Sequence, residues 1–170
     1  MAPIFVTTWY LEMRARPASR RSAAPHAITV ERLREPSAAL YRTLYETVGE
    51  RWHWVDRRRI DDALLLELIR APHVEVYAAR AANDLVGYYE LDRSGGTECK
   101  LVYFGLAPAW IGRRVGSWLL ERAIEHAFHD ARTALLTVHT CSLDHPRALP
   151  TDERAGFVRV DEAHHDFDPA

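Results

Sequence analysis

A turn rich in glycine and arginine, Ile111–Ser117, has the residue types best suited to binding a ligand. It follows an apolar segment that breaks at Gly105 and Pro108, and an amphipathic helix comes next. The first turn of a helix presents unpaired backbone N–H groups and the positive end of the helix dipole at one place. Phosphate groups bind at such places. The turn therefore predicts a site for a pyrophosphate.

Four residues of the same turn fit an anion in two ways. Gly112 and Gly116 let the backbone approach a ligand where a Cβ would collide. Arg113 and Arg114 add positive charge for phosphate. Short glycine motifs also match by chance, so an ordinary strand-to-helix connection with solvated arginines is the alternative on spacing alone.

A second group of reactive side chains closes the next β-branched segment, which ends in the run HTCSLDH over residues 139–145. His139 can accept a proton near neutral pH. Cys141 can donate a proton, or act as a nucleophile with His145 as its base. In the alternative interpretation, Asp144 and His145 cap the following helix and Cys141 is a small core residue. A cysteine and a histidine close in sequence are weak evidence for a nucleophile.

Trp52 and Trp54 stand in a charged segment between two predicted helices. Two tryptophans beside carboxylates can form an aromatic wall for an amine, or they can pin the loop to the core. We expect at least one of them to face a pocket. Glu12 and Glu90, on predicted strands, are candidate general bases if they face the cleft. The alternative is that both are solvent-facing carboxylates. We assign Glu90 to catalysis and Glu12 to the substrate side.

A metal site is not expected. His126, His129 and Asp130 have helical spacing, but their helix turns its apolar residues inward, so we interpret them as its solvated side. His164 and His165 are interpreted in the same way.

Composition bounds the remaining possibilities. At 170 residues the chain predicts a single domain over 1–170, with the 48% hydrophobic and 27% charged content of a globular protein. A net charge of −2 gives no reason to expect nucleic acid or an anionic membrane as partner. Two cysteines without metal-type spacing favour a reducing compartment. With no signal peptide and no apolar run long enough for a membrane span, a cytoplasmic location is expected.

The elements that must position these residues follow from hydrophobic periodicity and turn residues. A loop is expected over Arg14–Ala27, a tight hairpin at Ala82-Asn83-Asp84, and Ser37 as an N-cap. The predicted strands are Phe5–Met13, Val74–Arg80, Leu85–Leu91, Glu98–Leu106, Thr133–Thr140, Phe157–Val160 and His164–Phe167. The predicted helices are 36–48, 61–69, one after residue 114 and 146–154.

The stretch 102–120 resembles motif A of the GNAT superfamily of acyl-CoA-dependent N-acyltransferases. There a strand leads into a turn Arg/Gln-x-x-Gly-x-Gly/Ala that holds the pyrophosphate of coenzyme A. The residues here are Ile111-Gly112-Arg113-Arg114-Val115-Gly116. The last glycine matches, whereas Ile111 replaces Arg/Gln and Arg114 replaces the first glycine.

The resemblance implies a fold and a cofactor site. The fold is a mixed, mainly antiparallel α/β sheet splayed around an acyl-CoA cleft, with the order β-α-α-β-β-β-α-β-α-β-β. The pantetheine arm would lie in the gap. The cofactor-binding residues it implies are Phe104, Gly105, Leu106, Ile111, Gly112, Arg113, Arg114, Val115, Gly116, Ser117 and Asp144.

The same resemblance implies a reaction, in which an acyl group, most simply acetyl, passes from coenzyme A to the amine of a small molecule or peptide. Glu90, His139 and Cys141 are the catalytic candidates, and Trp52, Trp54 and Glu12 the substrate-binding ones. No metal is required, and a homodimer is compatible with the sequence. The alternatives are an acyl-CoA-binding module without transfer, and thioester hydrolysis or decarboxylation.

One position departs from the family. Its last helix commonly ends Tyr-x-x-x-Gly-Phe, and the tyrosine protonates the departing thiolate, but four residues before Gly156 stands Asp152. A solvated aspartic acid with a pKa near ~3.9 is almost wholly ionised at neutral pH. The sequence therefore predicts that Asp152 is not the general acid, unless its pKa is strongly raised.

Overall fold

The structure is a computed structural model, and it describes residues 4–18 and 22–168. Seven strands form one sheet: β1 Ile4–Met13, β2 Thr29–Leu33, β3 Val74–Ala81, β4 Asp84–Gly95, β5 Glu98–Leu106, β6 Leu135–Cys141 and β7 Val158–Phe167. Four α-helices accompany it: α1 Ala38–Gly49, α2 Asp62–Ile69, α3 Val115–His129 and α4 Ala148–Ala155. Among the described helices, none is long and apolar enough to cross a membrane.

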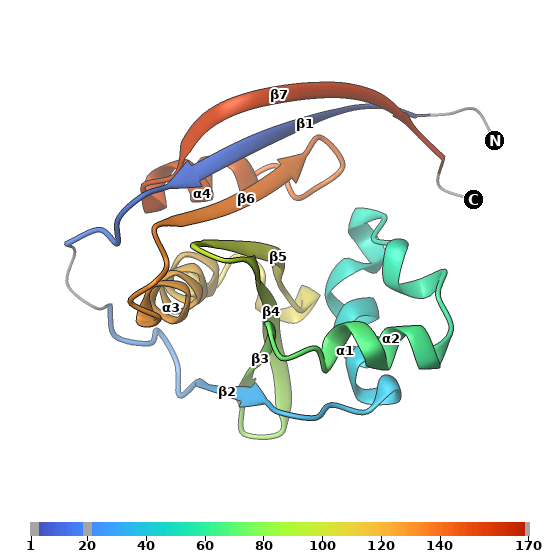
Figure 1. The fold of residues 1–170 in the computed structure, drawn as a ribbon. Coiled ribbons are helices and arrows are strands. Elements are labelled where there is room, and N and C mark those ends of the chain that lie inside the picture. The colour runs from blue at the N-terminus through green and yellow to red at the C-terminus, as the bar shows by residue number, and fades with distance from the viewer. Residues whose placement is uncertain (1–3, 19–21, 169–170) are drawn as a thin grey trace.

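The strand order is β2-β3-β4-β5-β6-β1-β7. All neighbouring pairs are antiparallel except β5 and β6, which are parallel because α3 lies between them in the chain. Figure 1 shows β1 and β7 running side by side as a long ribbon over the part of the sheet that ends in β6. The predicted fold class, a mixed and mainly antiparallel sheet with helices, is confirmed.

Helices cover both faces of the sheet, and the alternation along β3 explains how. Tyr77 and Ala79 pack with α3 in one core cluster, whereas Val76 and Ala78 pack with α1 and α2 in the other. Successive side chains of a strand point to opposite faces, so one strand serves both clusters. Leu149 of α4 packs against the α3 cluster. The site elements are thereby held on a rigid, two-sided core.

Local sequence signals explain where most elements begin. Ser37 accepts a hydrogen bond from the Leu40 N–H and so caps α1, and Asp61 caps α2 in the same way. The predicted hairpin between β3 and β4 is confirmed, with Ala82 in the left-handed region at φ 52°. Pro150 lies in the first turn of α4, where a missing N–H costs no helical hydrogen bond.

Two expectations about strands are wrong. The predicted pair Phe157–Val160 and His164–Phe167 is one continuous strand, β7, which pairs with β1 from Ile4↔Phe167 to Glu12↔Val158. Its polar middle residues are exposed on an edge strand, so their polarity does not mark a turn. The short edge strand β2 was not predicted, so the observed order is β-β-α-α-β-β-β-α-β-α-β.

Strands β5 and β6 separate partway along their length. Their parallel pairing runs from Glu98↔Leu135 to Leu101↔Val138 and stops there. Beyond it, β5 continues to Leu106 and β6 to Cys141. The ends of the two strands are therefore unpaired on the sides that face each other.

Candidate functional site

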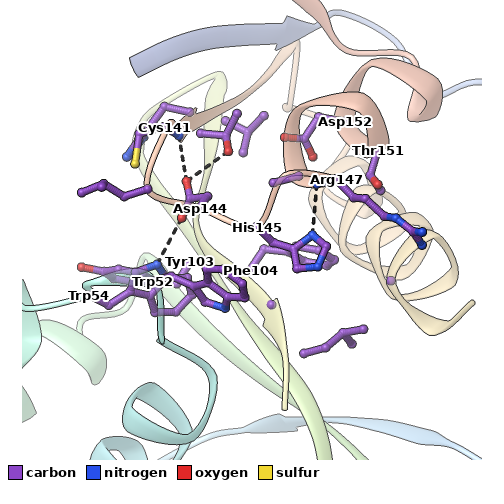
Figure 2. A pocket seen from close by; sticks show the side chains of 18 of the residues that line it. Trp52, Trp54, Tyr103, Phe104, Cys141, Asp144, His145, Arg147, Thr151 and Asp152 are labelled. Carbon is purple, nitrogen blue, oxygen red and sulfur yellow. Dashed lines mark hydrogen bonds between the residues drawn. The ribbon is translucent and has the colours of Figure 1, made fainter. Parts of the chain in front are cut away.

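A cavity of about 610 Å³ occupies the gap between the separated strands. Its walls come from the ends of β5 and β6, the turn before α3, the segment Trp52–Asp56, the helix α4 and the end of β7. Figure 2 shows side chains from several of these elements converging on one space. A cavity of this volume is in the range of small-molecule and cofactor sites.

The turn before α3 forms one end of the cavity. Arg114 is the N-cap residue and lies in the left-handed region at φ 62°, and Gly112 has φ 84°. This backbone favours glycine, which gives a physical reason for the glycine that the family has in place of Arg114. No side-chain cap from Arg114 occupies the first turn of α3, so its N–H groups are free to meet an anion.

The space beside these glycines is open. A Cβ on Gly112 would meet no atom within 4 Å, and one on Gly116 would meet only Leu106 Cδ1, at 3.7 Å. The protein itself therefore does not demand glycine at 116. Of the predicted cofactor residues in this turn, those that line the cavity are Ile111, Gly112, Arg114, Gly116 and Ser117. These features fit the pyrophosphate of coenzyme A.

Two predicted members of the turn do not line the cavity. Val115 has 0% exposure and belongs to the core under α3. The guanidinium of Arg113 lies over the ring of Trp110, 5.0 Å from its centroid. Cofactor binding by Arg113 and Val115 stays a prediction, and the geometry of the cavity does not support it.

The end of β5 forms the floor, and Phe104, Gly105 and Leu106 all line the cavity. Gly105 has a packing reason as well, because a Cβ there would come within 2.5 Å of Val48 Cγ1 on α1. Beyond Leu101 this strand has no partner on the β6 side. Its backbone groups on that side are available to a ligand.

Asp144 stabilises the loop after β6 through hydrogen bonds from three groups. Its Oδ2 accepts hydrogen bonds from the Thr140 hydroxyl at 3.0 Å and the Cys141 backbone N–H at 2.8 Å, and its Oδ1 accepts one from Trp54 Nε1 at 3.5 Å (Figure 2). His139 and Cys141 also line the cavity. Burial, followed by the charge of Asp144, raises the pKa of Cys141 to about 11. A thiol in this state is a poor nucleophile at neutral pH.

Trp52 and Trp54 both line the cavity but differ in their surroundings. Trp54 packs against the rings of Tyr45 and Tyr103, with centroids 5.5 and 5.1 Å away. Trp52 contacts only the His145 ring edge-on among the described aromatic residues, at 5.2 Å. Trp54 therefore anchors the loop, while Trp52 is the tryptophan more available to a ligand.

The two candidate carboxylates on strands lie outside the cavity lining. Glu90 is 1% exposed; its Oε2 accepts a hydrogen bond from Tyr41 at 2.5 Å, and its Oε1 pairs with Arg57 at 2.8 Å. Burial raises the pKa of Glu90, and the Arg57 charge and the Tyr41 hydrogen bond oppose that rise. Glu12 pairs with Arg14 at 2.9 Å. Neither carboxylate is placed where it could reach a bound amine directly.

Asp152 differs from the solvated carboxylate assumed above. It lines the cavity from α4 and is only 6% exposed. Burial, followed by the charges of Asp144 and Glu153, raises its pKa to about 7. The expectation of an ordinary, fully ionised aspartate therefore does not hold, because the side chain is buried beside the cavity.

Sequence reasoning missed three kinds of cavity residue. Tyr45 and Tyr103 were not among the predicted site residues, yet both line the cavity. His165 and Phe167 come from β7, whose residues carried no signal for a site. The burial of Asp152 had no local signal either. Within residues 4–18 and 22–168, no group of three or more His, Cys, Asp or Glu side chains is arranged to hold a metal.

The fold and the cavity define a class: an α/β protein with a ligand site between two splayed parallel strands, at a helix N-terminus. The sequence profile described as the acetyltransferase (GNAT) family matches residues 28–157. The chain belongs to this family of acyltransferases.

Solved structures show the same fold. A GCN5-related N-acetyltransferase from Sphaerobacter thermophilus superposes with a TM-score of 0.71 at 12% identity, over 97% of this chain and 52% of that one. A tandem GNAT protein from the clavulanic acid biosynthesis pathway gives 0.67 at 16%, over 95% and 53%. An aminoglycoside acetyltransferase from an uncultured soil metagenomic sample gives 0.62 at 16%, over 76% and 88%. The chain thus spans about half the length of the first two. No curated protein matches the sequence.

Proposed function

We propose that this protein transfers an acyl group, most simply acetyl, from coenzyme A to the amine of a small molecule or peptide. The observation that carries the proposal is one cavity that joins two kinds of wall. At one end are the amides and glycines of the turn before α3, and elsewhere lie the aromatic and carboxylate side chains of Trp52, Asp144 and Asp152. The first kind suits a pyrophosphate and the second an amine.

The end of β5 supports the chemistry between these walls. A thioester carbonyl gains negative charge when an amine attacks it, and backbone N–H groups stabilise that charge. Residues Phe104–Leu106 line the cavity and lack a strand partner on the β6 side. Alternate backbone N–H groups of this segment point to that side and are suited to polarise the carbonyl.

The test is incubation with acetyl-CoA, alone and with a panel of primary amines, while free thiol is measured. Thiol release that depends on an amine supports transfer. Release without an amine would indicate hydrolysis instead, and binding without turnover would indicate a binding module. Either of these last two results would overturn the proposed function.

Gly116→Val tests the coenzyme A site separately. We expect at least a tenfold loss of coenzyme A affinity in calorimetry, because the added methyl groups enter the space that the pyrophosphate needs. The fold should tolerate the change, since the nearest atom to a Cβ there is 3.7 Å away. An unchanged melting temperature is the control. Arg113→Ala, on a side chain that lies over Trp110, should lose much less. Unchanged affinity in Gly116→Val would remove the basis of the proposal.

A further inference from the structure

The Asp152 carboxyl faces the cavity and has no hydrogen-bond partner among the described residues. The residue is 6% exposed and lines the cavity from α4. Across the described parts of the chain, no N–H or O–H group donates a hydrogen bond to its carboxyl oxygens. A polar group that the protein leaves without a partner is available to hydrogen-bond with a ligand. Such a group, facing a cavity, points to a ligand that supplies the missing donor.

The surroundings favour a positively charged donor. Asp144 and Glu153 are the charged groups that act on Asp152, and both are negative. Both oxygens of Asp144 already accept hydrogen bonds, so Asp144 acts as a fixed negative charge. Figure 2 shows the Asp152 carboxyl pointing from α4 toward the loop that carries Asp144.

Other ionisable side chains also line the cavity. They are Tyr45, His53, Asp56, Tyr103, Arg114, His139, Cys141, His145, Arg147, Arg154 and His165. None of them donates a hydrogen bond to Asp152, and none is among the groups that shift its pKa. The local field at the carboxyl is therefore set by burial and by the two neighbouring carboxylates.

We propose that the Asp152 carboxylate receives the protonated amino group of the acceptor and takes its proton, and thus acts as the general base of the transfer. This inference rests on the proposed function. It assigns to Asp152 the role that Glu90 cannot fill, since Arg57 and Tyr41 hold Glu90 away from the cavity. Trp52 and Tyr103 line the same cavity, and aromatic rings attract cations.

The step balances as follows. The Asp152 carboxylate takes one proton from the ammonium, and the freed electron pair on nitrogen forms a C–N bond to the thioester carbonyl carbon. The C–S bond breaks, and its electron pair leaves on the thiolate of coenzyme A. A second proton passes from nitrogen to the thiolate. The proton held by Asp152 then returns to solvent.

The state of the carboxyl suits this role. With a pKa of about 7, Asp152 is roughly half ionised at neutral pH and is a far stronger base than a solvated aspartate. A bound ammonium stabilises the ionised form, so amine binding and proton transfer are coupled.

The first test needs no turnover. The carboxyl ¹³C resonance of Asp152, assigned by its absence in Asp152→Asn, is titrated with coenzyme A bound, with and without ethylamine, tyramine or spermidine. We expect at least one amine to lower the midpoint by a pH unit or more. If none moves the midpoint, the proposal is overturned, whether or not the protein transfers acyl groups.

The second test uses the amine of the panel with the fastest turnover. Asp152→Asn should lower kcat by about 10²–10⁴-fold, with coenzyme A affinity unchanged. Glu67→Gln, at an exposed acidic residue of α2 outside the cavity lining, is the control and should stay within about twofold. In the wild type, kcat/KM should rise with pH through about 7 and then level off. Full activity in Asp152→Asn, or a flat pH profile, would refute the assignment. Absence of turnover in the wild type would refute the proposed function instead, and the titration would still decide on the carboxyl.

Discussion

Glu90 and Asp152 are both buried acidic residues near the same cavity, but their surroundings are opposite. Each oxygen of Glu90 has a partner, Tyr41 on one side and Arg57 on the other. Asp152 has the charge of Asp144 nearby and no donor among the described residues. A partnered carboxylate is held in place by the fold, whereas an unpartnered one costs stability until a ligand arrives. Under our proposal for Asp152, hydrogen-bond partners, more than burial, separate a structural acid from a functional one.

The partnered cluster also positions the cavity wall. Arg57 follows the segment Trp52–Asp56, and its backbone N–H donates to Tyr45 Oη at 3.3 Å. Its guanidinium pairs with Glu90 and lies 5.5 Å from the centroid of the Tyr103 ring. Glu90 therefore contributes to the site indirectly: its ion pair with Arg57 helps to fix the loop that carries both tryptophans.

The largest effect on stability is expected when the ion-pair partner of Glu90 is removed. Arg57→Ala leaves the buried Glu90 charge without its ion-pair partner, so the free energy of unfolding should fall by about 3–5 kcal/mol. Chemical denaturation measures the loss. Arg57→Ala combined with Glu90→Gln should recover part of it, because the uncompensated charge is gone. An Arg57→Ala variant as stable as the wild type would break the distinction between the two carboxylates.

Asp152→Asn should change stability in the other direction. The folded pKa of Asp152 is raised from 3.8 to about 7, so the folded state binds this proton more tightly than the unfolded chain does. The associated stability is fully present below pH 3.8 and is lost as pH rises through about 7. Asparagine removes this penalty, and the variant should be more stable than the wild type at pH 8 by about 2–4 kcal/mol.

The measurement is the difference in unfolding free energy between the two proteins at pH 8 and at pH 5. The gain should be smaller at pH 5, where the wild-type carboxyl is mostly protonated. Glu67→Gln is again the control, since Glu67 is exposed on α2 and is not among the groups that act on Asp152. A destabilised Asp152→Asn protein at pH 8 would mean that the carboxylate has a partner after all.

The smallest effect is expected for the two tryptophans, Trp52 and Trp54, when each is replaced by alanine. Trp52 is the less anchored ring, so Trp52→Ala should raise the KM of the acceptor amine about three- to fivefold, which a cation–π contact of ~1 kcal/mol would give. Coenzyme A affinity should stay unchanged. Trp54→Ala is the contrasting variant and should mainly lower the melting temperature, because Trp54 packs on Tyr45 and Tyr103. Equal effects of both variants on coenzyme A binding would place the acceptor elsewhere.

Local signals were sufficient for much of the fold. The cap Ser37, the hairpin at Asn83 and the glycine-rich turn before α3 are determined by a few neighbouring residues, and the sequence predicts each of them. Pairing between distant segments carries no such signal. The strand β7 is mostly exposed and polar, so only its partner β1 makes it one strand.

The site residues also fall into two groups, those that the sequence could predict and those whose state depends on distant parts of the chain. The predicted residues of β5 and β6 and most of those of the turn line the cavity, whereas Arg113 and Val115 do not. The state of Glu90 could not be predicted, because its partners Tyr41 and Arg57 come from elsewhere in the sequence. The pKa of Asp152 depends on how α4 packs and on a charge from the loop before it. Such properties arise only from the assembled structure.

The position of β1 between β6 and β7 has a consequence for how the chain folds. The strands β3, β4 and β5 pair with their immediate neighbours in sequence, so they close short loops at low entropic cost and are expected to form early. In contrast, β1 pairs on both sides with late strands, as in Thr8↔Cys141 and Ile4↔Phe167.

During synthesis, β1 therefore has neither of its partner strands, β6 and β7, until most of the described chain has been made. An unpaired strand with apolar side chains such as Val6 and Leu11 is prone to aggregate in that interval. The wall of the cavity built from β6 and β7 is then completed last. We expect ligand-binding competence to appear as a late, slow phase of refolding, after the β3–β5 meander has gained its protection from hydrogen exchange.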